Sequence, residues 1–176
     1  MGNFYTNITV RGVEAGRTVK ALLDLGREAY VLELNPYSVV FDRQSEDQDT
    51  RIVAALAEHL AIKLEAVAFA VLNHDDDILW FQVYEQSDLV AEYANRGGPK
   101  TNVEALCRVF GRPRDTVPMW LLLRRPFLFQ VNRHQRLARR LGLPEASVGT
   151  GFNYLSRNEL PSGVTMDRLI HVRGTG

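Results

Sequence analysis

The alternation of two hydrophobic periods along the first 73 residues most restricts the folds open to this chain. Residues 3–11 alternate between two faces, and Ile8 and Val10 share one of them, which is the period of a half-buried strand. Residues 14–25 instead repeat apolar side chains at helical spacing, and Gly26 follows where such a helix would end. The chain therefore begins with a strand followed by a helix.

The same change of period occurs a second time before residue 74. The predicted elements are a strand at 28–34, a turn at Asn35-Pro36, a strand at 37–42, a polar loop at 43–49, a helix to residue 64 and a strand at 67–73. The order strand, helix, strand, strand, helix, strand is the split βαβ order of the ferredoxin-like fold. We therefore predict an α+β protein with a ferredoxin-like antiparallel sheet.

The segment from residue 67 to residue 93 is the most apolar part of the chain and also contains its densest cluster of charge. After the strand at 67–73, residues 77–85 and 89–93 read as two more strands, joined by a turn at 86–88. We expect this hairpin to extend the sheet and to leave a free sheet edge.

The clearest break lies at residues 94–101, where two glycines, a proline and a change in the sign of the charge coincide. We therefore divide the chain into a ferredoxin-like half at 1–94 and a basic C-terminal α/β lobe at 95–176, packed together as one unit. The elements expected in the lobe are a short helix at 102–110, a loop at 111–118, a strand at 119–123, a helix at 127–141 and a strand at 148–155. Gly149 and Gly151 would allow a bend or bulge in the last strand.

The neutral net charge conceals two oppositely charged halves. Residues 1–93 contain 7 Lys and Arg against 16 Asp and Glu, whereas residues 94–176 contain 14 against 5. Two interpretations are open, namely that the halves pair with each other, or that the basic half faces an anionic partner.

The acidic turn after residue 73 is the one candidate metal site. His74, Asp75 and Asp77 offer an imidazole and hard oxygen ligands for Mg²⁺, Mn²⁺ or Ca²⁺, although carboxylates from another segment would have to join them. The alternative is a solvated hairpin tip. Of the other histidines, His59 and His134 fall near apolar helix faces, and we expect both to be packed rather than to act as ligands.

The helix at 127–141 has the best-defined charged surface. Six arginines and no acidic residue lie between positions 124 and 140, namely Arg124, Arg125, Arg133, Arg136, Arg139 and Arg140. This positive face could bind an anion or a carboxylate-rich partner. We expect the phenylalanines of this segment to face the core, which leaves no aromatic side chains among the arginines for stacking on nucleic acid bases.

These features favour a small cytoplasmic interaction or regulatory module that uses a sheet edge and the arginine-rich helix to bind a protein partner or a second copy of itself. One alternative is a metal-dependent hydrolase or nuclease-like enzyme using the turn at Asp75 and Asp77, and another is a weak nucleic-acid binder. We expect no cofactor other than the possible divalent metal. We also expect no membrane partner, because no run approaches the roughly 18 apolar residues of a membrane span.

Overall fold

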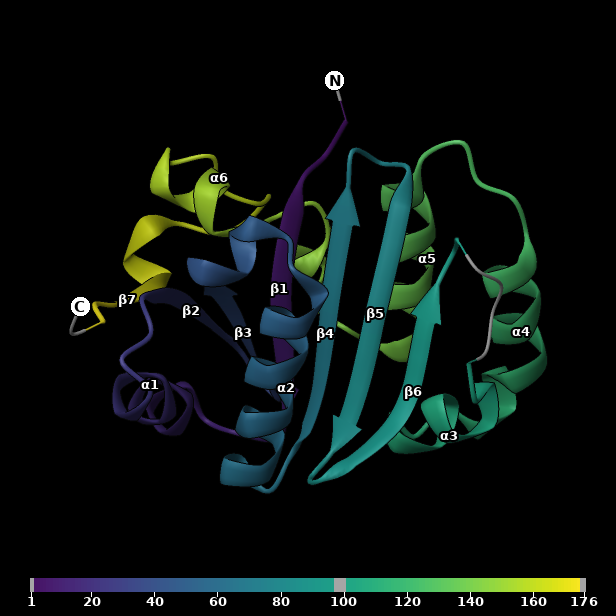
Figure 1. Cartoon of the computed structure of the whole chain (residues 1–176), viewed down its shortest axis with the longest axis horizontal. Coiled ribbons are helices and arrows are strands. Elements are labelled where there is room, and N and C mark those ends of the chain that lie inside the picture. The colour runs from purple at the N-terminus through teal and green to yellow at the C-terminus, as the bar shows by residue number, and fades with distance from the viewer. Residues whose placement is uncertain (1, 97–100, 175–176) are drawn as a thin grey trace.

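The computed structural model describes residues 2–96 and 101–174 (Figure 1). Its strands are β1 Tyr5–Arg11, β2 Ala29–Leu34, β3 Tyr37–Asp42, β4 Val67–His74, β5 Ile78–Glu85, β6 Asp88–Ala94 and β7 Leu169–Val172. Its α-helices are α1 Ala15–Asp24, α2 Thr50–Leu64, α3 Val103–Val109, α4 Thr116–Arg124, α5 Gln130–Leu141 and α6 Phe152–Ser156.

The strands form one antiparallel sheet in the order β6-β5-β4-β1-β3-β2-β7. The order of the central four, β4-β1-β3-β2, with α1 and α2 in the two crossovers, is the ferredoxin-like arrangement. On β1, Ile8 lies opposite Val40 of β3 and Ala70 of β4. The predicted α+β class and the extension by the β5-β6 hairpin are confirmed.

Helices α1 and α2 cover one face of the sheet (Figure 1). Ile8 and Val10 of β1 point to this side and pack in one cluster with Leu56 and Leu60 of α2. The small side chains Ala68 and Ala70 of β4 belong to the same cluster, together with others of α1 and α2. Period-two strands and period-3.6 helices therefore meet in one core, as the sequence pattern requires.

The other face of the sheet is covered by the C-terminal half of the chain, with α5 lying behind β5 and β6 (Figure 1). Phe69 and Phe81 pack there against Leu106, Met119 and Leu137 from α3, α4 and α5. Because β4 and β5 are buried on both faces, residues 67–72 of β4 and residues 78–81 of β5 are continuously apolar.

Two strands expected in the C-terminal half are helices instead. Within the apolar run at 119–123, Met119, Leu122 and Leu123 are buried in α4, whereas Trp120 and Leu121 are exposed, which is a helical period. A short apolar run does not distinguish these periods until its neighbours are included. Residues 148–155 form a loop and α6 rather than a strand. A Cβ atom at Gly151 would lie 2.3 Å from the Glu46 Oε1 and 3.2 Å from the Tyr5 Cα, so any larger residue there would displace the Glu46 carboxylate.

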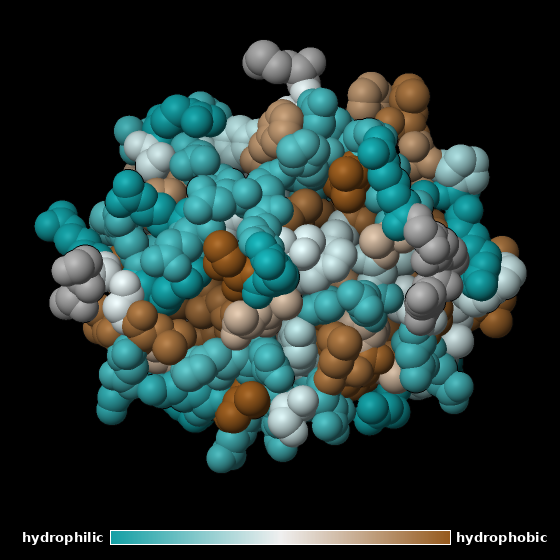
Figure 2. Space-filling model, viewed as in Figure 1, coloured by the Kyte–Doolittle hydropathy of each residue, from teal (hydrophilic) through white to brown (hydrophobic). Residues whose placement is uncertain are grey.

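The surface over α1 and α2 is largely hydrophilic, with apolar side chains in small separate patches (Figure 2). Apolar side chains also gather at the upper right of this view, over the connection between α4 and α5 (Figure 2). Among the described residues, no helix is both long enough and apolar enough to cross a membrane.

Candidate functional site

The acidic turn joins β4 to β5 and presents most of its predicted metal ligands to solvent. His74, Asp75 and Asp77 are exposed. Asp77 forms an ion pair with Arg96, and the His74 Nδ1 lies 2.5 Å from the Gln48 Oε1. Across residues 2–96 and 101–174, no three His, Cys, Asp or Glu side chains are grouped to hold a metal ion. Metal binding by His74, Asp75 and Asp77 therefore stays a prediction.

The middle aspartate of the turn, Asp76, is buried and caps α5. Its carboxylate accepts hydrogen bonds from the Val131 backbone N–H at 3.2 Å, from the Asn3 Nδ2 at 2.8 Å and from the Asn73 Nδ2 at 3.2 Å. Its backbone carbonyl accepts the Gln130 N–H at 2.9 Å. Because the residue before α5 provides no side-chain cap, Asp76 fulfils that role from the hairpin.

A buried chain of hydrogen bonds continues from this cap into the core. The Asn73 Nδ2 donates to the Tyr5 hydroxyl at 3.5 Å, and this hydroxyl lies 2.8 Å from the His134 Nδ1. Burial lowers the pKa of His134 to about 3 and raises the pKa of Tyr5. The prediction that His134 is packed is confirmed.

His59 is exposed, because it lies just outside the buried stripe of α2, and the prediction that it is packed is wrong.

The six predicted arginines separate into an exposed group and one buried residue. Arg133 is 4% exposed and donates hydrogen bonds to the Tyr93 hydroxyl and to the Arg125 carbonyl oxygen. Its guanidinium carbon lies 5.0 Å from the centre of the Phe127 ring. Burial lowers the pKa of Arg133. Its assignment to the positive face is therefore wrong, and it instead holds the connection between α4 and α5 in place. The exposed group is Arg124, Arg125, Arg136, Arg139 and Arg140.

Aromatic side chains do lie among the exposed arginines, and the expectation that every phenylalanine here faces the core is wrong. The Arg124 guanidinium stacks 3.9 Å from the centre of the Trp120 ring. The Arg136 guanidinium lies 5.4 Å from the centre of the Phe127 ring, and Phe129 is half exposed. The reason is that α5 begins at residue 130 rather than 127, so these phenylalanines belong to a connection instead of a helix face.

A groove between α4 and α5, with a cavity of about 650 Å³, brings the exposed arginines beside apolar side chains. We call it the α4–α5 groove. It is lined by Arg112, Asp115, Val117, Pro118, Leu121, Leu122, Arg125, Arg136, Arg139 and Arg140. The sequence did not indicate the apolar wall, because reading residues 119–123 as a strand concealed the outward face of α4. A helical count over residues 116–124 is the signal that would have found it.

Five guanidinium groups face one carboxylate in the α4–α5 groove. The Arg140 Nη1 lies 3.2 Å from the Asp115 Oδ1. The Arg139 Nε lies 3.4 Å from a carboxylate oxygen of Glu145, and both of those side chains are exposed. Arg125 and Arg136 form no ion pair with any side chain in the described ranges. The groove therefore has an uncompensated positive field.

The apolar side chains beside these arginines are unusually accessible. Val117 is 68% exposed and Leu121 is 56% exposed, and both lie on the groove wall. Leu128, in the connection after α4, is 86% exposed. Single apolar residues at a surface are ordinary, but a cluster with a polar rim is typical of an interaction site.

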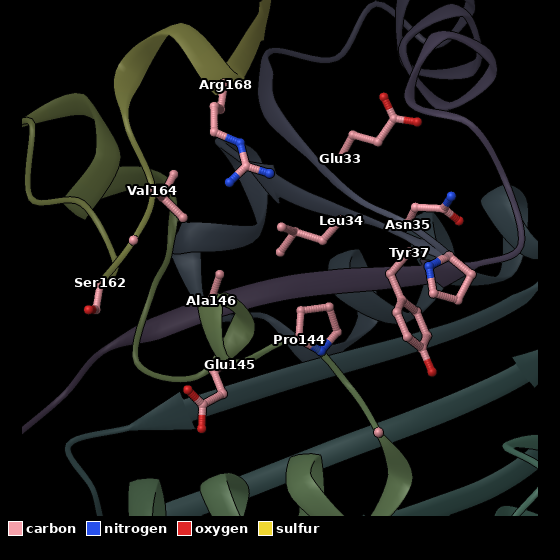
Figure 3. A pocket seen from close by; sticks show the side chains of 13 residues that line it. Glu33, Leu34, Asn35, Tyr37, Pro144, Glu145, Ala146, Ser162, Val164 and Arg168 are labelled. Atoms are coloured by element: carbon pink, nitrogen blue, oxygen red, sulfur yellow. The ribbon is translucent and has the colours of Figure 1, made fainter.

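A larger open cleft, of about 910 Å³, lies between the β2-β3 turn and the loops at 142–146 and 162–168 (Figure 3). Leu34, Ala146 and Val164 line it, and the Arg168 guanidinium points inward between them (Figure 3). The buried polar side-chain atoms that lack a hydrogen-bond partner in the described chain all belong to residues outside this lining. None of these unpartnered polar atoms therefore marks the cleft as a ligand site.

Strand β6 is one edge of the sheet, as the sequence predicted for the hairpin. The Glu92 carbonyl on this strand accepts a hydrogen bond from the Thr101 Oγ1 at 2.7 Å. Part of the edge is therefore engaged by the segment leading to α3, and residues 97–100 between them lie outside the described ranges.

Comparison with known proteins gives no relative for this chain. No protein-family model matches it, and neither the curated protein sequences nor the solved structures yield a significant match. Charge and exposed apolar surface coincide in the α4–α5 groove, which is therefore the candidate functional site.

Proposed function

We propose that this protein is an interaction module that binds an acidic segment of a partner protein in the α4–α5 groove. The observation that carries the proposal is the presence, in one groove, of five guanidinium groups and the exposed apolar wall of α4. Arginine is suited to this role because its planar guanidinium binds a carboxylate with two hydrogen bonds and is more weakly hydrated than an ammonium group.

The groove is held in shape before any partner arrives. Arg133 ties the Arg125 backbone to Tyr93, whose hydroxyl also donates to the Leu123 carbonyl oxygen at 3.0 Å. Asp76 fixes the start of α5 from the hairpin. Both walls are therefore anchored to the sheet, which reduces the conformational entropy that binding would cost.

The apolar wall favours a protein partner over a nucleic acid. Phosphate contacts come from arginine, lysine and polar groups and require no aliphatic surface, whereas Val117 and Leu121 leave an aliphatic surface beside the arginines. The centre of a protein interface buries such side chains within a polar rim.

The proposal is tested by fluorescence anisotropy with a labelled 18-residue peptide of Glu, Leu and Ala. We expect saturable binding that weakens as salt is raised, and no binding of the equivalent Lys, Leu and Ala peptide. Exchanging Arg125→Glu together with Arg136→Glu should weaken binding on the order of 10-fold or more, because attraction becomes repulsion.

The matched control is Arg17→Glu with Lys20→Glu, which changes the net charge equally at exposed positions of α1, on the other side of the sheet. This control should bind as the unmodified protein does. Equal weakening in both double variants would show that net charge alone drives binding. Tighter binding of a single-stranded oligonucleotide, or salt-dependent self-association in place of peptide binding, would also contradict the proposal.

A further inference from the structure

We infer that the segment bound in the α4–α5 groove is an amphipathic α-helix with an apolar stripe beside an acidic stripe, an inference that rests on the proposed function. The two walls of the groove differ in chemistry along their length. On α4, Val117 and Leu121 are four residues apart and form an apolar row. On α5, Arg136 and Arg140 are also four residues apart and form a cationic row. Each row follows the one-turn spacing of a helix surface.

The dimensions of the walls suit a helix of a few turns. α4 has 9 residues and α5 has 12, so they are about 14 and 18 Å long at 1.5 Å per residue. The chain rises along α4, crosses at residues 125–129 and descends along α5, so the two walls run in opposite directions (Figure 1). A third helix above them would pack at the usual interaxial distance of about 8–10 Å.

An extended peptide fits the groove less well for two reasons. Its side chains alternate at 180°, so apolar and acidic side chains would point to opposite sides instead of toward two adjacent walls. It would also need partners for its backbone N–H and C=O groups, whereas backbone groups within the walls of α4 and α5 already bond inside their own helices. A bound helix satisfies its own backbone and presents both stripes at once.

One arginine of the cationic row is already paired with a carboxylate of the protein itself. The acidic stripe of the bound helix would pair with the arginines that remain. Asp115 lies 3.2 Å from Arg140 at one end of the cationic row. Arg136, one turn earlier on α5, and Arg125, in the connection, form no ion pair within the described residues. We therefore expect acidic residues of the bound helix to pair with Arg136 and Arg125, while its apolar stripe covers Val117 and Leu121.

Two 18-residue peptides of identical composition in Glu, Leu and Ala test this inference. In the first, Leu and Glu occupy adjacent stripes at helical spacing, and in the second they alternate with a period of two. Titration calorimetry should show the first peptide binding on the order of 10-fold more tightly, and circular dichroism should show it gaining helix on binding. Equal affinity for both peptides would overturn the helical inference and leave the proposed function standing, whereas binding of neither would overturn both.

A substitution in the apolar wall locates the contact. Leu121→Gln should remove most of the preference for the helically patterned peptide. Because position 121 is exposed, the substitution should not disturb folding. The control is Ile62→Gln, because Ile62 is 50% exposed but belongs to α2, on the other face of the sheet. An equal loss in the two variants would place the peptide outside the groove and overturn the inference.

Discussion

Replacing Asp76 by asparagine should destabilise the protein far more than the same replacement at Asp75. Both residues lie in the turn with positive φ, 54° and 53°. Asparagine tolerates this conformation as aspartate does, so the exchange isolates the carboxylate. Asp76 is buried and bonded to the start of α5, whereas Asp75 is exposed.

The magnitude follows from the contacts of Asp76. A negative charge near a helix N-terminus contributes about 0.3–2 kcal/mol, the upper end applying where it is partly buried. In the variant, one carboxylate oxygen becomes an NH₂ group facing the donors of Asn3, Asn73 or Val131, and a buried donor without an acceptor costs about 1–3 kcal/mol. The free energy of unfolding should therefore fall by about 2–4 kcal/mol for Asp76→Asn and by less than about 0.5 kcal/mol for Asp75→Asn.

Urea unfolding followed by circular dichroism measures both values, because a change in midpoint at constant slope reports a change in stability. Thermal unfolding should show the Asp76→Asn variant melting roughly 5–15 °C lower. Equal stabilities for the two variants would refute the assignment of Asp76 as the cap of α5.

Three further outcomes are expected from buried groups. Arg133→Met should lower the free energy of unfolding by about 2 kcal/mol in urea titrations, because two buried hydrogen bonds are lost. Gly151→Ala should destabilise by about 1–3 kcal/mol through the clash with Glu46, whereas Gly16→Ala, with open space around its Cβ, should be neutral or stabilising. Because burial lowers the pKa of His134 from 6.5 to about 3, the unfolded state binds the extra proton, so stability should fall by up to about 1.4 kcal/mol per unit as the pH drops below 6.5. His134→Phe should reduce this dependence of stability on pH. An unchanged dependence would contradict the role assigned to His134.

The ferredoxin-like half could be predicted because its information is local. The hydrophobic period of each segment before residue 74 identifies it as a strand or a helix, and the order of these elements restricts the topology. β7 was missed for the opposite reason. It has four residues, and Leu169 pairs with Leu32 across most of the chain, so no local pattern identifies it.

The site could be predicted only in part. Arginine spacing correctly indicated a positive surface, but it could not distinguish Arg133 from Arg136, because burial of Arg133 depends on Tyr93 and on the connection before α5. Likewise, alternation in the acidic turn drew attention to Asp75 and Asp77, whereas the residue with long-range contacts is Asp76, whose partner Val131 is 55 positions away. Such roles depend on tertiary contacts that periodicity does not encode.

The emission of a tryptophan introduced by Val117→Trp, on the wall of the α4–α5 groove, tests the proposed occupancy of the groove most directly. The chain has two tryptophans, Trp80 and Trp120, and neither lines the groove, so Trp80→Phe with Trp120→Phe leaves the introduced side chain as the single reporter. Val117 is 68% exposed, so the substitution does not disturb the core. On titration with the helically patterned acidic peptide, we expect the emission to shift to shorter wavelength, because the peptide excludes water from the groove wall. The shift should saturate with the calorimetric affinity and disappear in Arg125→Glu with Arg136→Glu. Peptide binding that leaves this emission unchanged would contradict binding in the α4–α5 groove.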